Sequence, residues 1–241
     1  MERIHKLIAR SGTASLRRAE DLIRQGRVTV DGTPAEVGQR IDPSGAVVEI
    51  DGKRIPVDPD LVYHLVYKPV GVVSTASDTH GRETVVDLVG AGTRVWPVGR
   101  LDADSEGLVL VTNDGELTNF VTHPRYGVTK TYVALVSGAP TTADLTALES
   151  GVELEDGPAA ARSVRELDRS GDRVLVELVM TEGRNREVRR MCEAIGCEVV
   201  SLTRTAVGPL RDGQLRPGLS RALTPAEVNA LYAAASVPDD E

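Results

Sequence analysis

The pattern of apolar and polar residues begins with two short helical segments. Apolar residues recur at helical spacing in ERIHKLIARSG, residues 2–12, and in ASLRRAEDLIRQG, residues 14–26. A glycine stands at the end of each segment, Gly12 and Gly26, where a helix commonly stops. The first part of the chain therefore predicts two consecutive helices.

Two segments that alternate like strands follow these helices. They are VTVDG at residues 28–32 and VVEIDGKRI at residues 47–55, and the second contains Asp51-Gly52, a pair typical of a tight hairpin turn. The proline-rich segment RIPVDPD, residues 54–60, then reads as a linker. We therefore expect a small module over residues 1–60 and a domain boundary near residue 60.

The rest of the chain has more strand patterns than helix patterns. The predicted strands are VYHLVYKP, RVWPVG, GLVLVTN, KTYVALV, AARSVREL and DRVLVELVM. The predicted helices are GELTNFVTH, TTADLTALES, NREVRRMCEAIG and a last one whose start at Thr224, Pro225 and Glu227 forms a capping box. Because the strands are mostly adjacent, residues 61–236 should form an α+β domain on a largely antiparallel sheet, followed by an acidic tail at residues 237–241.

Composition fits a globular protein and excludes several classes. The 241 residues are 41% hydrophobic and 27% charged, with one Phe, one Trp and five Tyr, so the core must be aliphatic. No segment has the apolar core of a signal peptide or the ~20 apolar residues of a membrane span, so we expect a cytoplasmic protein with no membrane partner. Cys192 and Cys197 lack a second ligand pair for zinc, and we expect reduced thiols and no metal site.

Charge is distributed unevenly along a chain whose net charge is −8. Residues 1–30 hold seven basic side chains against three acidic ones, and EGRNREVRR, residues 182–190, holds four arginines against two glutamates. Residues 141–177 instead carry nine acidic and four basic side chains. Two separate basic regions are compatible with a nucleic-acid partner despite the acidic total, although a solvated charged surface would give the same pattern.

Three segments stand out together: VGRLDADSEGLVLVTNDGEL, HPRYGVTKTY and EGRNREVRRM. They resemble the signature blocks of the pseudouridine synthases, in the group that includes ribosomal small-subunit synthase A and large-subunit synthase B. The similarity runs from Arg3 to about Leu231, and residues 1–50 resemble a small RNA-binding module first described in a ribosomal protein. The resemblance implies a small N-terminal α/β RNA-binding module followed by a larger synthase domain with a mixed, mostly antiparallel sheet.

The resemblance also implies an active site. The essential aspartate of the family matches Asp102, which would attack the sugar or the base or remove a sugar proton. Its tyrosine matches Tyr132, expected to lie against the target base, and its arginine matches Arg189, expected to pair with Asp102 and keep it ionised. Leu202 would lie near the apolar floor of the pocket. For Asp104 we expect a turn or capping role.

Ribosomal RNA is the implied partner, with the target uridine of a stem-loop flipped out of its stack. The residues expected to contact this RNA are Arg3, Lys6, Arg17, Arg18, Arg24, Lys68, Arg100, Lys130, Arg186 and Arg190. The resemblance is closer to the large-subunit enzyme, which implies large-subunit rRNA as substrate. Isomerisation transfers no net electrons, so we expect no cofactor, and we expect the protein to act as a monomer.

Two other functions fit part of the sequence. A non-catalytic RNA-binding ribosome-assembly factor would use the same basic regions, but it has no use for the acidic loop around Asp102. A nucleosidase would need a second carboxylate at a suitable spacing, for which Asp104 or Glu106 is available. We expect a pseudouridine synthase, because it alone requires Asp102, Tyr132 and Arg189 together.

Overall fold

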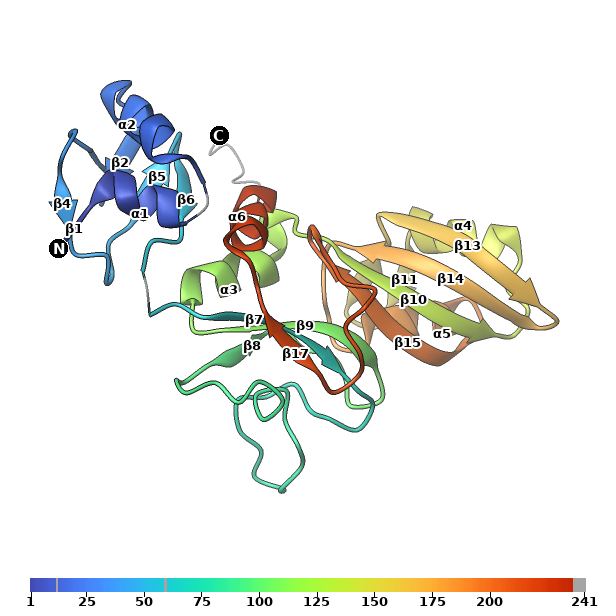
Figure 1. The fold of residues 1–241 in the computed structure, drawn as a ribbon. Helices are drawn as coiled ribbons and strands as arrows, with labels where there is room; N and C mark the ends of the chain where they lie inside the picture. Colours follow the sequence, from blue (N-terminus) through green and yellow to red (C-terminus); the bar gives the residue numbers. More distant parts are fainter. Residues whose placement is uncertain (12, 59, 236–241) are drawn as a thin grey trace.

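The computed structural model describes residues 1–11, 13–58 and 60–235 as a small N-terminal module beside a larger domain (Figure 1). In the module, β1 (Glu2–Arg3) pairs with β4 (Arg40–Ile41), and α1 (Ile4–Arg10) packs against α2 (Leu16–Arg24). Four more strands form an antiparallel sheet in the order β3-β2-β5-β6; they are β2 (Val28–Val30), β3 (Thr33–Pro34), β5 (Val48–Ile50) and β6 (Lys53–Ile55).

Local sequence accounts for the turns of the module. Asp51 and Gly52 both have positive φ, as a two-residue primed turn requires, and they join β5 to β6 as predicted. Gly26 follows α2 at φ +70°, a left-handed conformation that glycine adopts without a steric penalty, so the predicted helix end there is confirmed. The predicted end at Gly12 lies outside the described residues.

The module has an apolar core of its own, separate from the cores of the larger domain. Its buried residues run from Ile4 to Val57 and come from both helices and the four-stranded sheet. Two polar contacts join the module to the larger domain: Arg54 forms an ion pair with Glu116, and the Asn229 amide donates to the carbonyl of Ser11 at 2.8 Å. The boundary near residue 60 stays a prediction, and the acidic tail at residues 237–241 lies outside the described residues.

The larger domain is built on a nine-stranded sheet whose pairings are mostly antiparallel. Its order is β13-β14-β10-β15-β9-β7-β17, with β16 paired to β15 and β8 to β9. The strands are β7 (Tyr63–Lys68), β8 (Trp96–Val98), β9 (Glu106–Thr112), β10 (Lys130–Ser137), β13 (Ser163–Ser170), β14 (Arg173–Met180), β15 (Glu198–Val207), β16 (Leu210–Arg211) and β17 (Ser220–Ala222). One pairing, β9 with β15, is parallel, which confirms the predicted mixed sheet.

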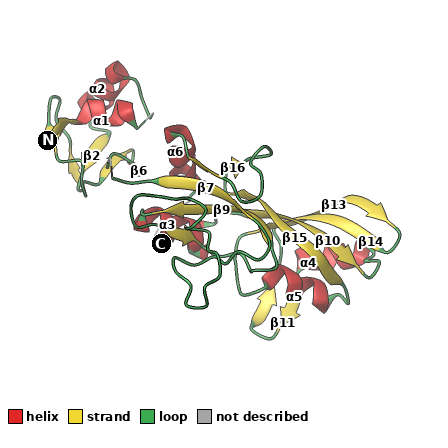
Figure 2. Ribbon diagram, turned by 60° about the horizontal axis from the view of Figure 1, so that its bottom comes forward, coloured by secondary structure: helices red, strands yellow, loops and turns green. Residues whose placement is uncertain are grey.

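Helices cover each half of this sheet (Figures 1 and 2). The helices α3 (Gly115–Thr122) and α6 (Pro225–Ala234) pack together over β7 and β9, and their apolar residues share one core with those strands. The other half carries α4 (Thr142–Ser150), α5 (Glu187–Ala194) and the hairpin of β11 (Val152–Leu154) and β12 (Gly157–Ala159). A 3₁₀ turn covers Pro124–Tyr126. No helix in the described part of the chain could cross a bilayer.

The two halves of the sheet meet at a short junction. There β9 and β15 pair through only two residue pairs, Thr203 with Glu106 and Arg204 with Gly107. Gly107 has φ +114°, and a Cβ at this position would lie within 3.0 Å of three backbone atoms of Arg204. Only glycine allows this approach. The acidic loop of residues 99–105 ends two residues before Gly107.

Each strand and helix predicted from the pattern has a counterpart in the structure. The capping box at the start of α6 is confirmed, with Thr224 Oγ1 accepting from the Glu227 amide. The predicted strand at residues 160–167 begins and ends about three residues later, as β13. Sequence reasoning missed the hairpin β11–β12, β16, β17 and, most importantly, β15, which is at the centre of the sheet.

Candidate active site

A pocket lies where the two halves of the larger domain's sheet meet. The acidic loop of residues 99–105 forms one wall, and the loop of residues 182–188 at the start of α5 forms another. Tyr132 of β10, Met180 of β14 and Leu202 of β15 supply the remaining surface. The empty volume is about 750 Å³. The structure thus brings Asp102, Tyr132 and Leu202 to one cavity, as the family resemblance implies.

Asp102 is presented by a tight turn before β9. The amide of Ser105 donates to the carbonyl of Asp102 at 3.1 Å, which closes the turn. The Asp102 side chain is 33% exposed, so its carboxylate remains open to the pocket. The turn is followed at once by β9, a strand that is buried along nearly its whole length. A rigid, buried strand thus carries a carboxylate that a ligand reaches.

Arg186 is the cation nearest to that carboxylate. Its Nη1 lies 4.0 Å from Asp102 Oδ2 and 3.0 Å from Asp104 Oδ2. Arg186 occupies the N-cap of α5 in a left-handed conformation, φ +49° and ψ +31°, which a non-glycine residue adopts at an energetic cost. Backbone strain of this kind is common at functional sites, and here it turns a guanidinium toward both carboxylates.

Arg189 does not form the predicted ion pair with Asp102. Its Nη2 donates to the carbonyl of Asp104 at 3.1 Å and to Ser105 Oγ at 3.3 Å, and it lies 3.4 Å from Asp104 Oδ2. Its Nη1 donates to the carbonyl of Val199 at 3.0 Å. Because the guanidinium is buried and its fork is taken up by these acceptors, Arg189 holds the backbone of the acidic loop from behind.

Asp104 is more than the turn residue we predicted. Burial acts to raise the pKa of its carboxyl, but the hydrogen bond from Arg186 and the charge of Arg189 outweigh burial and hold that pKa below its usual range. Asp104 therefore stays ionised and binds both arginines. The Asp104 carboxylate thus holds Arg186 and Arg189 in place.

Tyr132 and Leu202 lie on neighbouring antiparallel strands. Tyr132 pairs in register with Arg204, and Leu202 of the same strand pairs with Ala134, two residues along β10. Tyr132 is 9% exposed and Leu202 6%, so both form a nearly dry wall of the pocket. A ring that packs against an aliphatic side chain in this way offers a flat apolar surface to a base.

Lys68 and Lys130, two of the residues expected to contact RNA, are buried. Lys68 is fully buried at the end of β7, and its Nζ donates to the carbonyls of Ser105 at 2.7 Å and Pro69 at 3.0 Å. Burial lowers the pKa of Lys68 to about 8, and the nearby carboxylates of Asp102 and Asp104 oppose that shift. These contacts make Lys68 an internal support of the acidic loop, because its ammonium binds the Ser105 carbonyl from inside the protein.

Lys130 is buried beside the pocket. It is 8% exposed, and it shares a face of β10 with Tyr132, as predicted. Burial and, to a lesser extent, the charge of Arg204 lower the pKa of Lys130 to about 8, while Glu187 acts against the shift. The RNA contact expected of Lys130 stays a prediction.

Arg204 is a site residue that sequence reasoning missed. It is 3% exposed, and it donates from Nε to the carbonyl of Leu108 at 2.7 Å and from Nη1 to that of Arg100 at 3.4 Å. The Arg100 carbonyl belongs to the acidic loop, and the Leu108 carbonyl lies in β9, the strand that follows the loop. Arg204, Arg189 and Lys68 thus hold the same loop from three directions, and no spacing in the sequence indicates that they converge.

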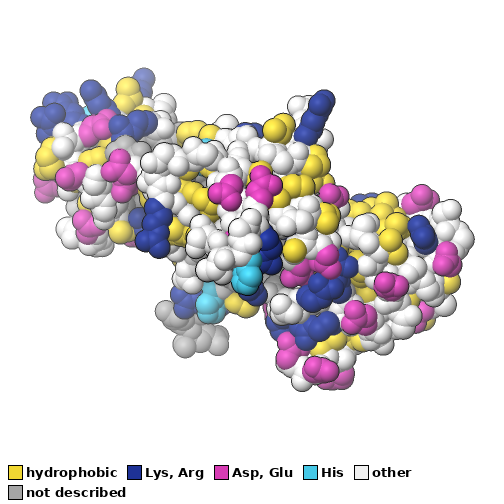
Figure 3. All heavy atoms as spheres, turned by 90° about the horizontal axis from the view of Figure 1, so that it is seen from below, with side chains coloured by type: hydrophobic (Ala, Val, Ile, Leu, Met, Phe, Trp, Pro, Cys, Tyr) yellow, Lys and Arg dark blue, Asp and Glu magenta, His cyan; other side chains and the backbone are white. Residues whose placement is uncertain are grey.

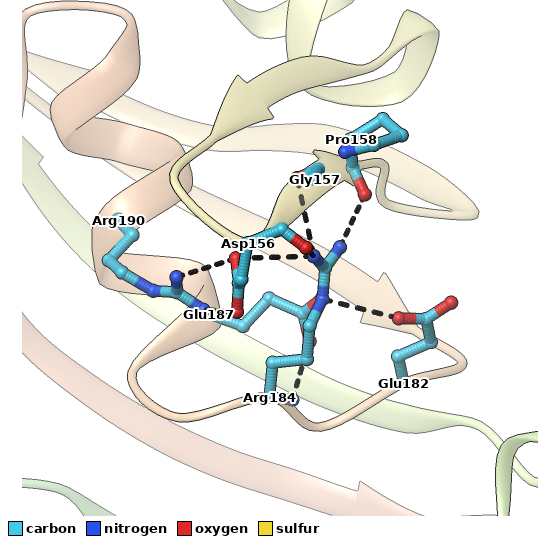
Figure 4. Close-up of polar contacts among 7 residues, drawn as sticks. All are labelled: Asp156, Gly157, Pro158, Glu182, Arg184, Glu187 and Arg190. Carbon is cyan, nitrogen blue, oxygen red and sulfur yellow. Dashed lines mark hydrogen bonds and ion pairs between the residues drawn. The ribbon is translucent and has the colours of Figure 1, made fainter.

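Arg190 is also committed to a partner within the protein (Figure 4). Its two terminal nitrogens donate to both oxygens of Asp156, at 2.8 and 3.0 Å, from the turn between β11 and β12. Arg184 reaches the same turn through Asp156 and Gly157 and also binds Glu187 at 2.9 Å. The RNA contact expected of Arg190 stays a prediction. These contacts brace the wall of the pocket that carries Arg186.

The remaining predicted RNA contacts lie on the surface. Five are in the N-terminal module, and of these Arg24 forms ion pairs with Asp21 and Glu20. The residues expected to contact RNA that are exposed in the structure are Arg3, Lys6, Arg17, Arg18, Arg24, Arg100 and Arg186. Figure 3 shows Lys and Arg side chains gathered over the N-terminal module and again on the larger domain, where Asp and Glu side chains lie beside them. Within the described ranges, no three His, Cys, Asp or Glu side chains group as metal ligands would.

Comparison with known proteins places these features in a family. Residues 62–194 match the model of the RNA pseudouridylate synthase family, and residues 2–48 match the S4 domain. The chain is 44% identical to ribosomal large subunit pseudouridine synthase B of Bacillus subtilis, over 98% of this chain and 97% of that protein. It is also 44% identical to an uncharacterized RNA pseudouridine synthase of Mycobacterium bovis, over 96% of this chain and 93% of that protein. A crystal structure of a pseudouridylate synthase covers 96% of this chain and is itself covered completely, with a TM-score of 0.65 and 28% identity.

Proposed function

Because the chain belongs to the RNA pseudouridylate synthase family and begins with an S4 domain, we propose that it isomerises a uridine of large-subunit ribosomal RNA to pseudouridine with Asp102 as the essential carboxylate. The observation that carries the proposal is the position of Asp102. It is one-third exposed in a pocket shared with Tyr132 and Leu202, on a loop that three buried cations support. A ribosomal RNA substrate would place the protein in the cytoplasm.

The reaction exchanges one bond between base and sugar for another. The bond from C1′ of the ribose to N1 of uracil breaks, the base turns, and C1′ joins C5, whose proton is lost to water while N1 gains one. The atoms and electrons balance without an oxidant or reductant. A carboxylate that attacks C1′, attacks the base or removes a sugar proton would serve, and each of these routes needs Asp102 ionised.

Residues around Asp102 have separate roles in this proposal. Arg186, whose Nη1 lies 4.0 Å from Asp102 Oδ2, is the positive charge that compensates the Asp102 carboxylate for the water it loses when RNA closes the pocket. Arg189 fixes the loop backbone at Asp104 and Ser105, so its effect on the reaction is to aim Asp102. Tyr132 lies against the uracil, which must leave its stack in the RNA to reach the pocket.

Tritium release tests this proposal directly. The purified protein is incubated with large-subunit and small-subunit rRNA transcripts that carry tritium at C5 of uracil. We expect release from the large-subunit transcript in an amount that matches one uridine per molecule, and chemical mapping of pseudouridine then gives its position. Release from the small-subunit transcript alone would overturn the choice of substrate, and release from neither would favour the non-catalytic assembly factor.

A further inference from the structure

A second hollow lies on the other side of the acidic loop. It is lined by residues 73–75, 77–80 and 82 on one side and by Arg100–Ala103 and Asn185 on the other. Its empty volume is about 780 Å³, close to the 750 Å³ of the first pocket. The two share Arg100, Leu101, Asp102 and Asn185, so the acidic loop is a partition between two cavities.

The segment that forms this hollow is tied to the acidic loop. Ser74 Oγ accepts the amide of Leu101 and donates to the carbonyl of the same residue, each at 3.0 Å. Gly71 donates its amide to the carbonyl of Ala103 at 2.7 Å. These bonds reach the residues on either side of Asp102, so the hollow is built together with the carboxylate and does not depend on a ligand to form.

The same segment is also closed on itself. Val73 pairs with Thr84 in a parallel bridge, and Asp78 accepts the amides of His80 at 3.0 Å and Arg82 at 2.9 Å. The hydrogen bond from the Arg82 side chain is the main cause that holds the pKa of Asp78 below its usual range. Asp78, the one carboxylate that this segment contributes to the hollow, is thus ionised and already bound, with its side chain 6% exposed.

What remains open in the hollow is suited to a nucleotide. The hydroxyls of Ser77 and Thr79 and the imidazole of His80 line it, and Arg100 stands on the partition with its side chain exposed. Hydroxyls and an imidazole recognise the edges of a base, and a guanidinium recognises phosphate. The hollow lacks the apolar, enclosed lining of a site for a small apolar ligand.

We propose that this second hollow is a subsite for the nucleotide next to the target uridine in the RNA strand. The inference rests on the proposed function, because it takes the first pocket as the place of the target base. A strand whose uridine enters the first pocket must cross the partition, and Arg100 then meets the phosphate that joins the two nucleotides. Recognition of this neighbour would contribute to the choice of uridine.

The test uses two leucine variants at adjacent positions. Ser77→Leu fills the hollow, and the Ser77 side chain itself makes no hydrogen bond that leucine would break. Ala76→Leu adds the same side chain at an exposed neighbouring residue that does not line the hollow. Equal melting temperatures for both variants and wild type would show that the fold is intact.

Each protein is titrated with a fluorescent stem-loop RNA centred on the uridine that tritium release and mapping identify. The RNA is made intact and with an abasic residue directly before or directly after the target. We expect Ser77→Leu to weaken binding of the intact RNA about 10-fold and Ala76→Leu less than 2-fold. One of the two abasic RNAs should cost wild type about 10-fold in affinity and cost Ser77→Leu less than 2-fold.

Other results separate the two proposals. If a target uridine is found but both abasic RNAs bind Ser77→Leu and wild type with the same relative loss, the subsite is refuted and the proposed function stands. The same holds if Ser77→Leu binds the intact RNA as tightly as Ala76→Leu does. If no transcript releases tritium, the proposed function fails and the subsite fails with it.

Discussion

Gly107 is the point at which the backbones of β9 and β15 come closest, and Gly107→Ala is the sharpest test of the junction between the two halves of the sheet. Alanine is strained at φ +114°, and its Cβ would lie within 3.0 Å of the N, C and O atoms of Arg204. Those atoms belong to the backbone of a central strand, so no side chain can move aside to make room. The strands must separate instead.

The cost has two parts. A non-glycine residue in a backbone conformation of this kind costs about 1–3 kcal/mol, and overpacking a well-packed interior costs about 1–3 kcal/mol more. Middle values add to about 4 kcal/mol, which in a protein of this size lowers Tm by roughly 8–16 °C. Separation would also draw Arg204 away from the carbonyls of Leu108 and Arg100, which hold the acidic loop.

Urea unfolding followed by circular dichroism measures this effect. Gly115→Ala is the matched control, because Gly115 begins α3 without a positive φ and a Cβ there would have no neighbour within 4 Å. We expect the control to be neutral or slightly more stable, since alanine is a better helix former than glycine. If Gly107→Ala unfolds within about 1 kcal/mol of wild type, the close approach of β9 to β15 is wrong.

Three further predictions follow from the support of the acidic loop and from the two cores. Arg189→Lys should keep part of the single-turnover rate at saturating RNA, because lysine keeps the charge but lacks the planar fork, and Arg189→Met, which loses both, should keep almost none. A wild-type rate in Arg189→Met would show that Arg189 is not needed to aim Asp102. Lys68→Met should lower stability by about 1–3 kcal/mol, because it leaves the carbonyls of Ser105 and Pro69 without a donor. Burial puts the folded-state pKa of Lys68 at about 8, below its unfolded value, so the unfolded chain binds more protons than the folded one above that pH. The stability of wild type relative to Lys68→Met should therefore rise from about pH 8 to 10. A stability difference between the two proteins that stays constant or shrinks in urea titrations across this range would refute the pKa assigned to Lys68. Deletion of residues 1–60 should leave a folded domain by circular dichroism and reduce both RNA affinity and its salt dependence. An unfolded remainder would show that the larger domain depends on the core of the module.

Local signals in the sequence were enough to predict much of the fold. The turn at Asp51-Gly52 and the capping box at Thr224 are decided by residues next to one another, and both are present. The strand β14 could be recognised because it alternates between buried and partly exposed residues along its length. β15 was missed because Ser201, Thr203 and Arg204 interrupt its apolar pattern, although Arg204 is buried in the sheet.

The site was predictable in part for a similar reason. The loop that carries Asp102 and the strand that carries Tyr132 are continuous segments, and the fold brings both to one pocket. The contacts that each basic side chain makes depend on acceptors far away in the sequence. Arg190 binds Asp156, 34 residues away, and Lys68 binds the carbonyl of Ser105, 37 residues away. Composition alone could not predict these contacts within the protein.

The chemistry assigned to Asp102 is the central claim of this account, and Asp102→Asn tests it most directly. The amide is nearly isosteric with the carboxylate but carries no charge, and the turn at Ser105 uses the Asp102 backbone carbonyl, so the loop should keep its shape. The measurement is tritium release from C5-labelled rRNA by the purified variant in single turnover, with RNA binding measured on the same preparation. We predict no detectable release with RNA affinity within about 2-fold of wild type. Release at a substantial fraction of the wild-type rate would contradict the claim and remove Asp102 from the reaction.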